Sequence, residues 1–362
     1  MITERRFPDA DALEQAAALL KAGELVAFPT ETVYGLGASA FDQDAVQKIF
    51  AVKGRPSNNP LIVHVADVEA ALPLCHVNRE ALALMAAFCP GPLTLLLPKK
   101  DRIPPQVNAG LPSVAIRIPS HPVAQALLRA SRLPIAAPSA NASGRPSPTT
   151  ATHVFHDLQG KVPLILDGGP CPVGLESTVL DMAAETPTIL RPGAITPEQL
   201  LSVLPATRVA DSVLRPLEQG EEPLSPGMMY RHYAPKGKLV LVAGQPNHVQ
   251  DRCLRLYRQA LLEGAVVKIL IFEEHLPLYA AFFRDAEAGT LILMGSLAHP
   301  ETVAHRLFSL LRRMDEERAE LILCEAMAPT GIGLAIMNRL RRASSFHLED
   351  ADQPWIPQER SR

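Results

Sequence analysis

The chain has 362 residues, of which 47% are hydrophobic and 20% are charged. This composition excludes an intrinsically disordered protein, and the length favours two folded domains over one. The formal net charge of −3 excludes a nucleic-acid binder that is basic over its whole surface, so any site for a polyanion has to be local.

Cysteine usage and the N-terminal sequence indicate the compartment. The cysteines are odd in number and dispersed without a C-x-x-C pair, which predicts reduced thiols and neither a disulfide framework nor a zinc ribbon. The start, MITERRFPDADALEQ, lacks the apolar core of a signal peptide, and no stretch approaches the ~20 apolar residues of a membrane span. We therefore expect a cytoplasmic protein that makes no membrane contact.

Residues 1–205 mix helical and extended patterns without strict alternation. Such a mixture predicts a twisted α/β sheet with several antiparallel strands and flanking helices. The predicted helices are 9–22, 42–52, 80–88, 121–131 and 197–204, and the predicted strands are 25–28, 61–65, 94–98, 113–119, 133–139, 163–169, 177–182 and 188–193.

The character of the sequence changes over residues 206–237, which are charged and rich in proline and glycine, so we expect a linker there. Strands and helices then alternate regularly over 238–348, which predicts a smaller, Rossmann-like parallel α/β domain. In that domain we expect helices at 247–263, 300–316 and 333–342. We expect the tail, 349–362, to be loosely ordered.

A G-x-G-x-x-A pattern, formed by Gly35, Gly37 and Ala40, follows the first predicted strand. It has the outline of a dinucleotide-binding turn, which requires an acidic residue about 20 positions further on to hold a ribose hydroxyl. The corresponding window instead contains Lys53 and Arg55. The residue pattern therefore disfavours a dinucleotide site.

Lys53 and Arg55 run from a predicted helix into a proline-rich loop. Two cations at this spacing suit the oxygens of a phosphate, and a solvated surface pair is the alternative. His64 lies within the apolar run LIVHV, where a histidine is more often a satisfied core residue than a ligand contact. Arg117 alternates with the apolar residues of its strand, so it faces solvent or pairs with a carboxylate across a cleft.

A second polar cluster follows the strand predicted at 133–139. A loop rich in hydroxyl and amide groups forms hydrogen bonds with the polar edges of a ligand, or else it is a turn whose side chains cap a helix. The sequence has no G-x-S-x-G, H-E-x-x-H or P-loop motif, and Glu31 and Glu176 are the notable carboxylates of the marked segments. These features predict a nucleotide-phosphate site with a small polar co-substrate. The residues of the cluster are Ser139, Asn141, Ser143, Arg145 and Ser147.

An ordered set of motifs runs through the chain. The motifs are PTETVYGLG, K-x-R-P-x-x-N-P-L, PGPLT, PSAN-x-S-G-x-P-S-P-T, G-x-E-S-T-V and LRPG, followed by SPGMMYRHYAP and GIGLAIMNRLRRAS. This set resembles the YrdC-type threonylcarbamoyl-AMP synthases, in their long two-domain form. The resemblance implies a YrdC-like catalytic domain over 1–205, a linker over 206–237 that forms a lid, and a Rossmann-like domain over 238–348. The alternatives are a non-catalytic RNA-binding module of the same fold, which calls for more basic and aromatic residues, and a carbamoyl-transfer enzyme, which carries further domains.

The resemblance also implies an activity: L-threonine, bicarbonate or CO2, and ATP give threonylcarbamoyl-AMP and pyrophosphate. A separate transferase then modifies adenosine 37 of tRNAs that read codons beginning with A, and the synthase itself makes at most a weak tRNA contact. Mg²⁺ is expected to arrive on the ATP phosphates, without a dedicated metal site or a tightly bound organic cofactor.

The resemblance assigns site residues by position in this sequence. The residues it implies for L-threonine are Thr32, His64, Arg117, Ala137 and Ser177. Those it implies for ATP are Lys53, Arg55, Asn59, Ser113, Ser139, Asn141, Ser147, Arg191 and Tyr230, with Lys53 and Arg55 as the catalytic pair.

Overall fold

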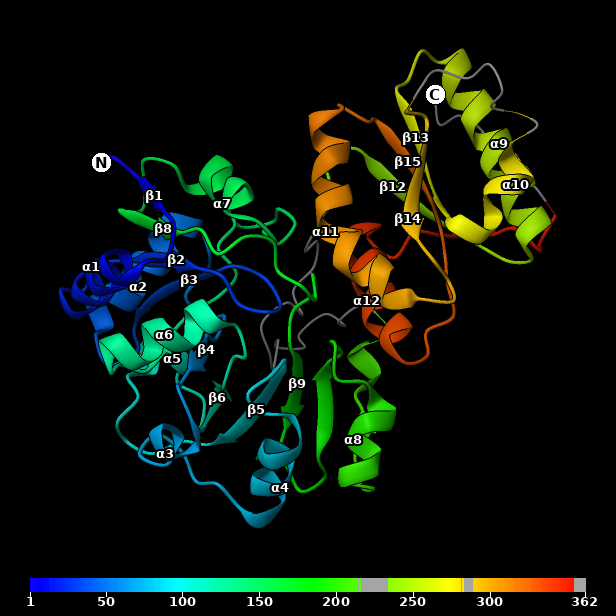
Figure 1. Ribbon diagram of the computed structural model, residues 1–362. Coiled ribbons are helices and arrows are strands. Elements are labelled where there is room, and N and C mark those ends of the chain that lie inside the picture. The colour runs from blue at the N-terminus through cyan, green and yellow to red at the C-terminus, as the bar shows by residue number, and fades with distance from the viewer. Residues whose placement is uncertain (214, 216–233, 281, 283–288, 355–362) are drawn as a thin grey trace.

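The computed structural model describes residues 1–213, 215, 234–280, 282 and 289–354 of the chain. These residues form two β-sheets, each with its own helices, and the chain passes from the first to the second only once (Figure 1). Most of the predicted linker, including Tyr230 and most of the SPGMMYRHYAP motif, lies outside the described residues.

The first sheet has 11 strands of mixed direction, as the sequence predicts. Parallel pairs such as β1 with β8 alternate along the sheet with antiparallel pairs such as β2 with β3. In sheet order the strands are β1 (Glu4–Arg6), β8 (Leu164–Leu166), β2 (Val26–Phe28), β3 (Gly35–Ser39), β7 (Ile135–Ala136), β4 (Ile62–His64), β6 (Ser113–Arg117), β5 (Leu93–Pro98), β9 (Thr178–Asp181), β10 (Thr188–Arg191) and β11 (Arg208–Val209).

Helices cover both faces of this sheet. On one face α1 and α6 pack through Leu20 and Leu127 against Phe28 and Leu166. The larger core lies on the other face, under α2, α4, α7 and α8. Side-chain caps set several helix starts, as where the Asp42 carboxylate accepts the amides of Asp44 and Ala45. The helices are α1 (Ala10–Lys21), α2 (Gln43–Lys53), α3 (Val68–Ala71), α4 (Arg79–Phe88), α5 (Pro105–Asn108), α6 (Pro122–Ser131), α7 (Ala151–Leu158) and α8 (Pro197–Val203).

The second sheet has five strands, all parallel, and confirms the prediction of a Rossmann-like fold. Helices α9 and α10 cover one face and α11 and α12 the other, and Figure 1 shows α11 and α12 on the side of the first sheet. In sheet order the strands are β14 (Leu291–Gly295), β13 (Val267–Phe272), β15 (Leu321–Glu325), β12 (Lys238–Ala243) and β16 (Leu348–Asp350). The helices are α9 (Pro246–Leu262), α10 (Leu276–Tyr279), α11 (Pro300–Glu316) and α12 (Ile332–Ala343).

Several short elements differ from the sequence prediction. The G-x-G segment is not a turn but strand β3, paired with β2 and β7. Strand β11 pairs with β10 inside the segment predicted as a linker. The tail begins as β16, beside β12, and the Asp352 carboxylate accepts the amide of Gln245, so order extends through this part of the segment expected to be loose. Helix α7 was not predicted, because it is only 8 residues long and its Thr150 cap follows a proline-rich stretch.

Candidate functional site

A small cavity of about 50 Å³ opens at the centre of the first sheet. Its walls come from the ends of β4, β6 and β10 and from the loops after β2, β7 and before β9. The lining residues are Thr30, Thr32, Val33, Tyr34, Gly35, Arg55, Pro60, Leu61, Ile62, His64, Arg117, Ala137, Pro138, Ser139, Glu176, Ser177 and Arg191.

The loop after β2 is shaped by Thr30. Its hydroxyl donates to the carbonyl of Val33 (2.6 Å) and accepts the amides of Thr32 and Val33. The same oxygen lies 2.8 Å from Oγ1 of Thr32. Side chain-to-backbone bonds of this kind hold a tight turn, and they fix the Thr32 hydroxyl at the cavity wall.

Arg117 pairs with a carboxylate across the cleft, which is one of the two alternatives its strand position allows. Its Nη2 lies 2.8 Å from Oε1 of Glu31, and both side chains are about 95% buried. Glu31 is fixed on its other oxygen by the amide of Ser120 (3.1 Å). The Nε of Arg117 has no hydrogen-bond partner within the described part of the chain. Because Arg117 also lines the cavity, an anion there would meet a guanidinium that is only partly paired.

His64 lies beside Arg117, since β4 and β6 pair these two residues. Its Nδ1 is 3.2 Å from the carbonyl oxygen of Ile62, and its ring packs edge-on against Phe28. Burial, and then the positive charge of Arg117, lower the pKa of His64 to about 3. The imidazole is therefore neutral near pH 7, and it contributes hydrogen bonding to the cavity without a positive charge.

Ser177 and Arg191 form the wall on the side of β9 and β10. The guanidinium of Arg191 donates from Nε and Nη2 to the carbonyl of Ser177 (3.1 and 3.0 Å) and from Nη2 to its hydroxyl. The hydroxyl also lies 2.7 Å from Oγ1 of Thr94. These bonds place a hydroxyl and a buried cation next to each other at the cavity.

Lys53 lies behind the cavity wall. Its Nζ donates to the carbonyls of Ser139 and Asn141, so the last residue of α2 holds the start of the segment 138–149, which we name the serine loop. Burial, and then the neighbouring Arg55, lower the pKa of Lys53 well below its ordinary value. Within the loop, the Ser139 hydroxyl donates to Oδ1 of Asn141 (2.5 Å).

Glu176 is a buried carboxylate at the cavity, and it joins the serine loop to the wall. One oxygen accepts the Ser147 hydroxyl (2.6 Å), and the other accepts Nε of Arg339 from α12 (3.0 Å). Burial alone would raise the pKa of Glu176, but the guanidinium groups of Arg339 and Arg191 and the Ser147 hydroxyl hold it below its usual value. The carboxylate is therefore ionised near neutral pH.

The structure brings most of the residues named from the sequence to one place. Those that line the cavity are Thr32, Arg55, His64, Arg117, Ala137, Ser139, Ser177 and Arg191. Lys53, Asn141 and Ser147 contact lining residues from behind, and Asn59 precedes the lining residue Pro60, whose carbonyl accepts Nη2 of Arg55. Ser113 is buried at the opposite end of β6 from Arg117 and does not line the cavity, while Tyr230 lies outside the described residues.

Sequence reasoning did not select Thr30, Tyr34 or Arg339 for this site. The hydroxyl of Tyr34 donates to the carbonyl of Gly169 (2.7 Å), and burial raises its pKa, so it is a neutral phenol. Thr30 and Tyr34 lie within the motif PTETVYGLG, and that motif could have indicated that they belong to the site. Arg339 lies 163 positions from Glu176, and no local pattern connects them.

The chain is 48% identical over 345 residues to the threonylcarbamoyl-AMP synthase of Bacillus subtilis, and the match covers 95% of this chain and 96% of the relative. The chain belongs to the threonylcarbamoyl-AMP synthase family. A family member from Pyrococcus abyssi, also named threonylcarbamoyl-AMP synthase, is 41% identical over 92% of this chain and 94% of its own length.

Both halves of the chain match families. The Sua5–YciO–YrdC family, described as "Telomere recombination", matches residues 18–193, and "Threonylcarbamoyl-AMP synthase, C-terminal domain" matches residues 195–345. The crystal structure of P. abyssi Sua5 complexed with L-threonine is similar with a TM-score of 0.86 at 40% identity, covering 96% of this chain and 98% of that chain. The resemblance to threonylcarbamoyl-AMP synthases that the motifs indicate is thereby confirmed.

Among the described residues, no cluster of three or more histidine, cysteine, aspartate or glutamate side chains has an arrangement able to bind a metal ion. None of the helices in these residues combines the length and the apolar character needed to span a bilayer.

Proposed function

We propose that this protein is an ATP-dependent threonylcarbamoyl-AMP synthase that joins L-threonine, bicarbonate or CO2, and ATP in the cavity of the first sheet. The observation that carries the proposal is the buried Arg117 at the cavity wall, with an unpartnered Nε in the described structure and with His64 and Ser177 also lining the cavity. A guanidinium in this setting suits a carboxylate, and the neighbouring hydroxyl and neutral imidazole suit the remaining polar groups of threonine.

The threonine subsite follows from these neighbours. Arg117 binds the α-carboxylate, Thr32 and Ser177 offer hydroxyls, and the backbone at Ala137 completes the contact. Glu31 orients Arg117 and balances its charge when threonine is absent. We propose that His64 acts as a neutral hydrogen-bonding group, because burial keeps it unprotonated.

The nucleotide subsite lies on the side of Arg55, Ser139 and Arg191. We assign the ATP phosphates to Lys53, Arg55, Asn59, Ser139, Asn141 and Ser147, and further nucleotide contacts to Ser113, Arg191 and Tyr230. Cations and hydroxyls placed in advance stabilise the negative charge that develops during transfer, at no cost of rearrangement. Mg²⁺ enters as part of the substrate MgATP.

The chemistry then proceeds in two steps. The neutral amine of threonine adds to CO2 and loses a proton, which gives a carbamate. A carbamate oxygen attacks the α-phosphorus of ATP, the bond from this phosphorus to the bridging oxygen breaks, and pyrophosphate leaves. The site holds the three small reactants in the orientation that the reaction needs. The entropy lost in bringing them together, which is a large part of the barrier for such a reaction, is then lost on binding. The mixed anhydride formed is an activated acyl donor, for which we propose a tRNA-modifying transferase as the consumer.

The test is pyrophosphate release from ATP, with L-threonine and bicarbonate omitted in turn. We expect release only when both are present. We also expect a loss of about 100-fold or more in Lys53→Ala, since the variant frees the carbonyls of Ser139 and Asn141 and misplaces the loop residues assigned to the phosphates. Lys48→Ala is the matched control, because Lys48 is on the same helix but is half-buried at the surface and bonded to Glu24.

Two results would contradict the proposal. Pyrophosphate release that ignores threonine would indicate a plain ATPase. No release under any condition, together with binding of RNA, would instead favour the non-catalytic RNA-binding module.

A further inference from the structure

The contact between the two domains contains buried charges that lead to the candidate nucleotide subsite. Arg312 and Arg339 belong to α11 and α12 of the second domain, and their side chains are 6% and 0% exposed. Each pairs with a buried carboxylate of the first domain, Asp157 or Glu176. Burying charges costs free energy unless they are paired, so a contact built from them fixes a geometry more than it adds stability.

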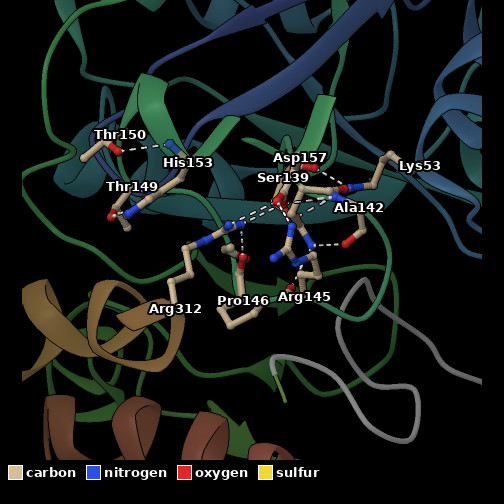
Figure 2. Close-up of polar contacts among 12 residues, drawn as sticks. Lys53, Ser139, Ala142, Arg145, Pro146, Thr149, Thr150, His153, Asp157 and Arg312 are labelled. Carbon is tan, nitrogen blue, oxygen red and sulfur yellow. Dashed lines mark hydrogen bonds and ion pairs between the residues drawn. The ribbon is translucent and has the colours of Figure 1, made fainter. Parts of the chain in front are cut away.

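Arg312 holds the serine loop from outside. Its Nη2 donates to Oδ2 of Asp157 (2.8 Å) and to the carbonyl of Pro146 (2.5 Å), while Nη1 donates to Oδ1 of Asp157 (3.2 Å). Asp157 in turn accepts the amide of Ala142 (3.3 Å) and the guanidinium of Arg145, both in the loop. Figure 2 shows Arg312 reaching Asp157 and Pro146 beside Ser139 and Lys53.

Arg339 holds the other end of the same loop. Its Nε donates to Glu176, whose second oxygen accepts the hydroxyl of Ser147, and its Nη1 donates to the carbonyl of Pro192 (2.5 Å), next to Arg191. A chain of hydrogen bonds therefore runs from α12 through Glu176 to a serine assigned to the ATP phosphates.

An apolar contact keeps these arginines in place. Val33 and Leu175, both of the first domain, are buried in the apolar cluster of the second domain, which includes Phe308 and Leu311 of α11. Thr149 of the serine loop adds a polar contact, with its hydroxyl 3.0 Å from that of Ser309. The segment that carries Glu176 and Ser177 to the cavity is therefore packed directly on the second domain.

We propose that Arg312 and Arg339 are positioning residues for the nucleotide, through which the second domain sets the conformation of the serine loop and of the Ser147 hydroxyl. The identity of the ligand as ATP rests on the proposed function; the coupling itself rests on the contacts between the domains. The second domain thereby takes part in nucleotide binding without touching the nucleotide.

The experiment measures ATP and L-threonine affinity by calorimetry in Arg312→Met and Arg339→Met, together with pyrophosphate release. We expect ATP affinity to fall by about 10-fold or more, as the loss of a hydrogen bond to a charged group implies, and threonine affinity to change by less than about 2-fold. Arg339→Lys keeps the charge next to Glu176 and should recover part of the loss. Arg313→Met is the matched control on α11, because Arg313 is exposed and pairs with Glu317.

Two readouts separate positioning from general stability. In a double-mutant cycle, Arg339→Met should have little further effect on ATP affinity once Ser147 is alanine, because both act through one hydroxyl. Hydrogen exchange of residues 138–149 should accelerate in Arg312→Met in the absence of any ligand.

Several outcomes would overturn the proposal. The first is unchanged ATP affinity in both variants together with unchanged hydrogen exchange of the serine loop. The second is an equal loss of affinity for ATP and for threonine. The third is full additivity of the effects of Arg339→Met and Ser147→Ala on ATP affinity. A wild-type chain that binds ATP and shows the coupling but releases no pyrophosphate would contradict the proposed function and leave this inference standing. A wild-type chain that does not bind ATP would contradict both.

Discussion

Arg117 is divided between two tasks. Its Nη2 is occupied by Glu31, while its Nε has no hydrogen-bond partner in the part of the chain that the structure describes. A planar guanidinium can serve two carboxylates at once because its donors point in fixed directions, whereas a lysine ammonium at the same place would be a single point of charge.

We therefore predict that Arg117→Lys weakens L-threonine binding by about 10-fold or more, in line with a lost hydrogen bond between charged groups. ATP affinity should remain within about 2-fold, since the residues assigned to the ATP phosphates come from α2 and from loops, and not from β6. Calorimetric titration of each ligand checks this, with Arg129→Lys on the exposed surface of α6 as the control. Equal weakening of both ligands would contradict the assignment of Arg117 to threonine.

The low pKa of His64 makes the free energy of unfolding depend on pH. In the unfolded chain its pKa returns to about 6.5, while burial and Arg117 hold it to about 3 in the folded chain. Between these values the unfolded state binds the extra proton, so the free energy of unfolding falls as the pH drops below 6.5. One such group contributes a slope of at most about 1.4 kcal/mol per pH unit.

Urea unfolding from pH 4 to pH 7 measures this slope. His64→Gln should show a shallower dependence than the wild type over that window. If this variant kept the wild-type slope, His64 would bind protons equally in the folded and unfolded states, and the assignment of the slope to His64 would be wrong.

At the scale of elements, strand β3 explains the glycine pattern that resembles a nucleotide-binding turn. A Cβ on Gly37 would lie 2.7 Å from Cγ2 of Ile135 and 2.8 Å from Cε1 of Phe28. A Cβ on Gly35 would be less crowded, at 3.3 Å from Cζ of Phe28. The glycines therefore make room for the ring of Phe28, which packs against His64.

We predict that Gly37→Ala lowers the free energy of unfolding by about 1–3 kcal/mol, the usual result of overpacking a core. Gly35→Ala should lose less stability but should reduce ligand affinity, because Gly35 lines the cavity. Thermal unfolding and calorimetry of the two variants test the contrast. A Gly37→Ala protein as stable as the wild type would show that Phe28 can move aside freely.

Long elements and residues clustered in one motif could be predicted from the sequence. Helix α11 begins and ends at the predicted residues, because its apolar stripe is regular and Pro300 marks its start. Strand β3 could not be predicted, because glycine has low strand propensity and because one of its two neighbours in the sheet, β7, lies far along the chain. Likewise Lys53 and Arg55 are visible in one loop, whereas Arg339 reaches Glu176 only through tertiary packing.

At the scale of the whole molecule, the two domains are joined without room for a larger side chain at Gly174. A Cβ there would lie 2.5 Å from Cα of His305 and 2.6 Å from its carbonyl oxygen, both backbone atoms of α11. The residue also has φ +80°, which disfavours any other amino acid.

We predict that Gly174→Ala separates the unfolding of the two domains. The wild type should unfold in one calorimetric transition, since its domains share an apolar cluster, and the variant in two. Gly160→Ala is the control, because its φ of +78° carries the same backbone strain while a Cβ there meets nothing within 4 Å. Identical single transitions in all three proteins would contradict the prediction.

The placement of Val33 and Leu175 has a practical consequence for dissecting the chain. Both side chains belong to the first half of the sequence but are covered by the second half. A fragment that holds the first sheet alone would expose them to water and would tend to aggregate. Two fragments produced in the same cell would instead recover their shared core by association, so complementation of separately encoded halves is the expected behaviour of this architecture.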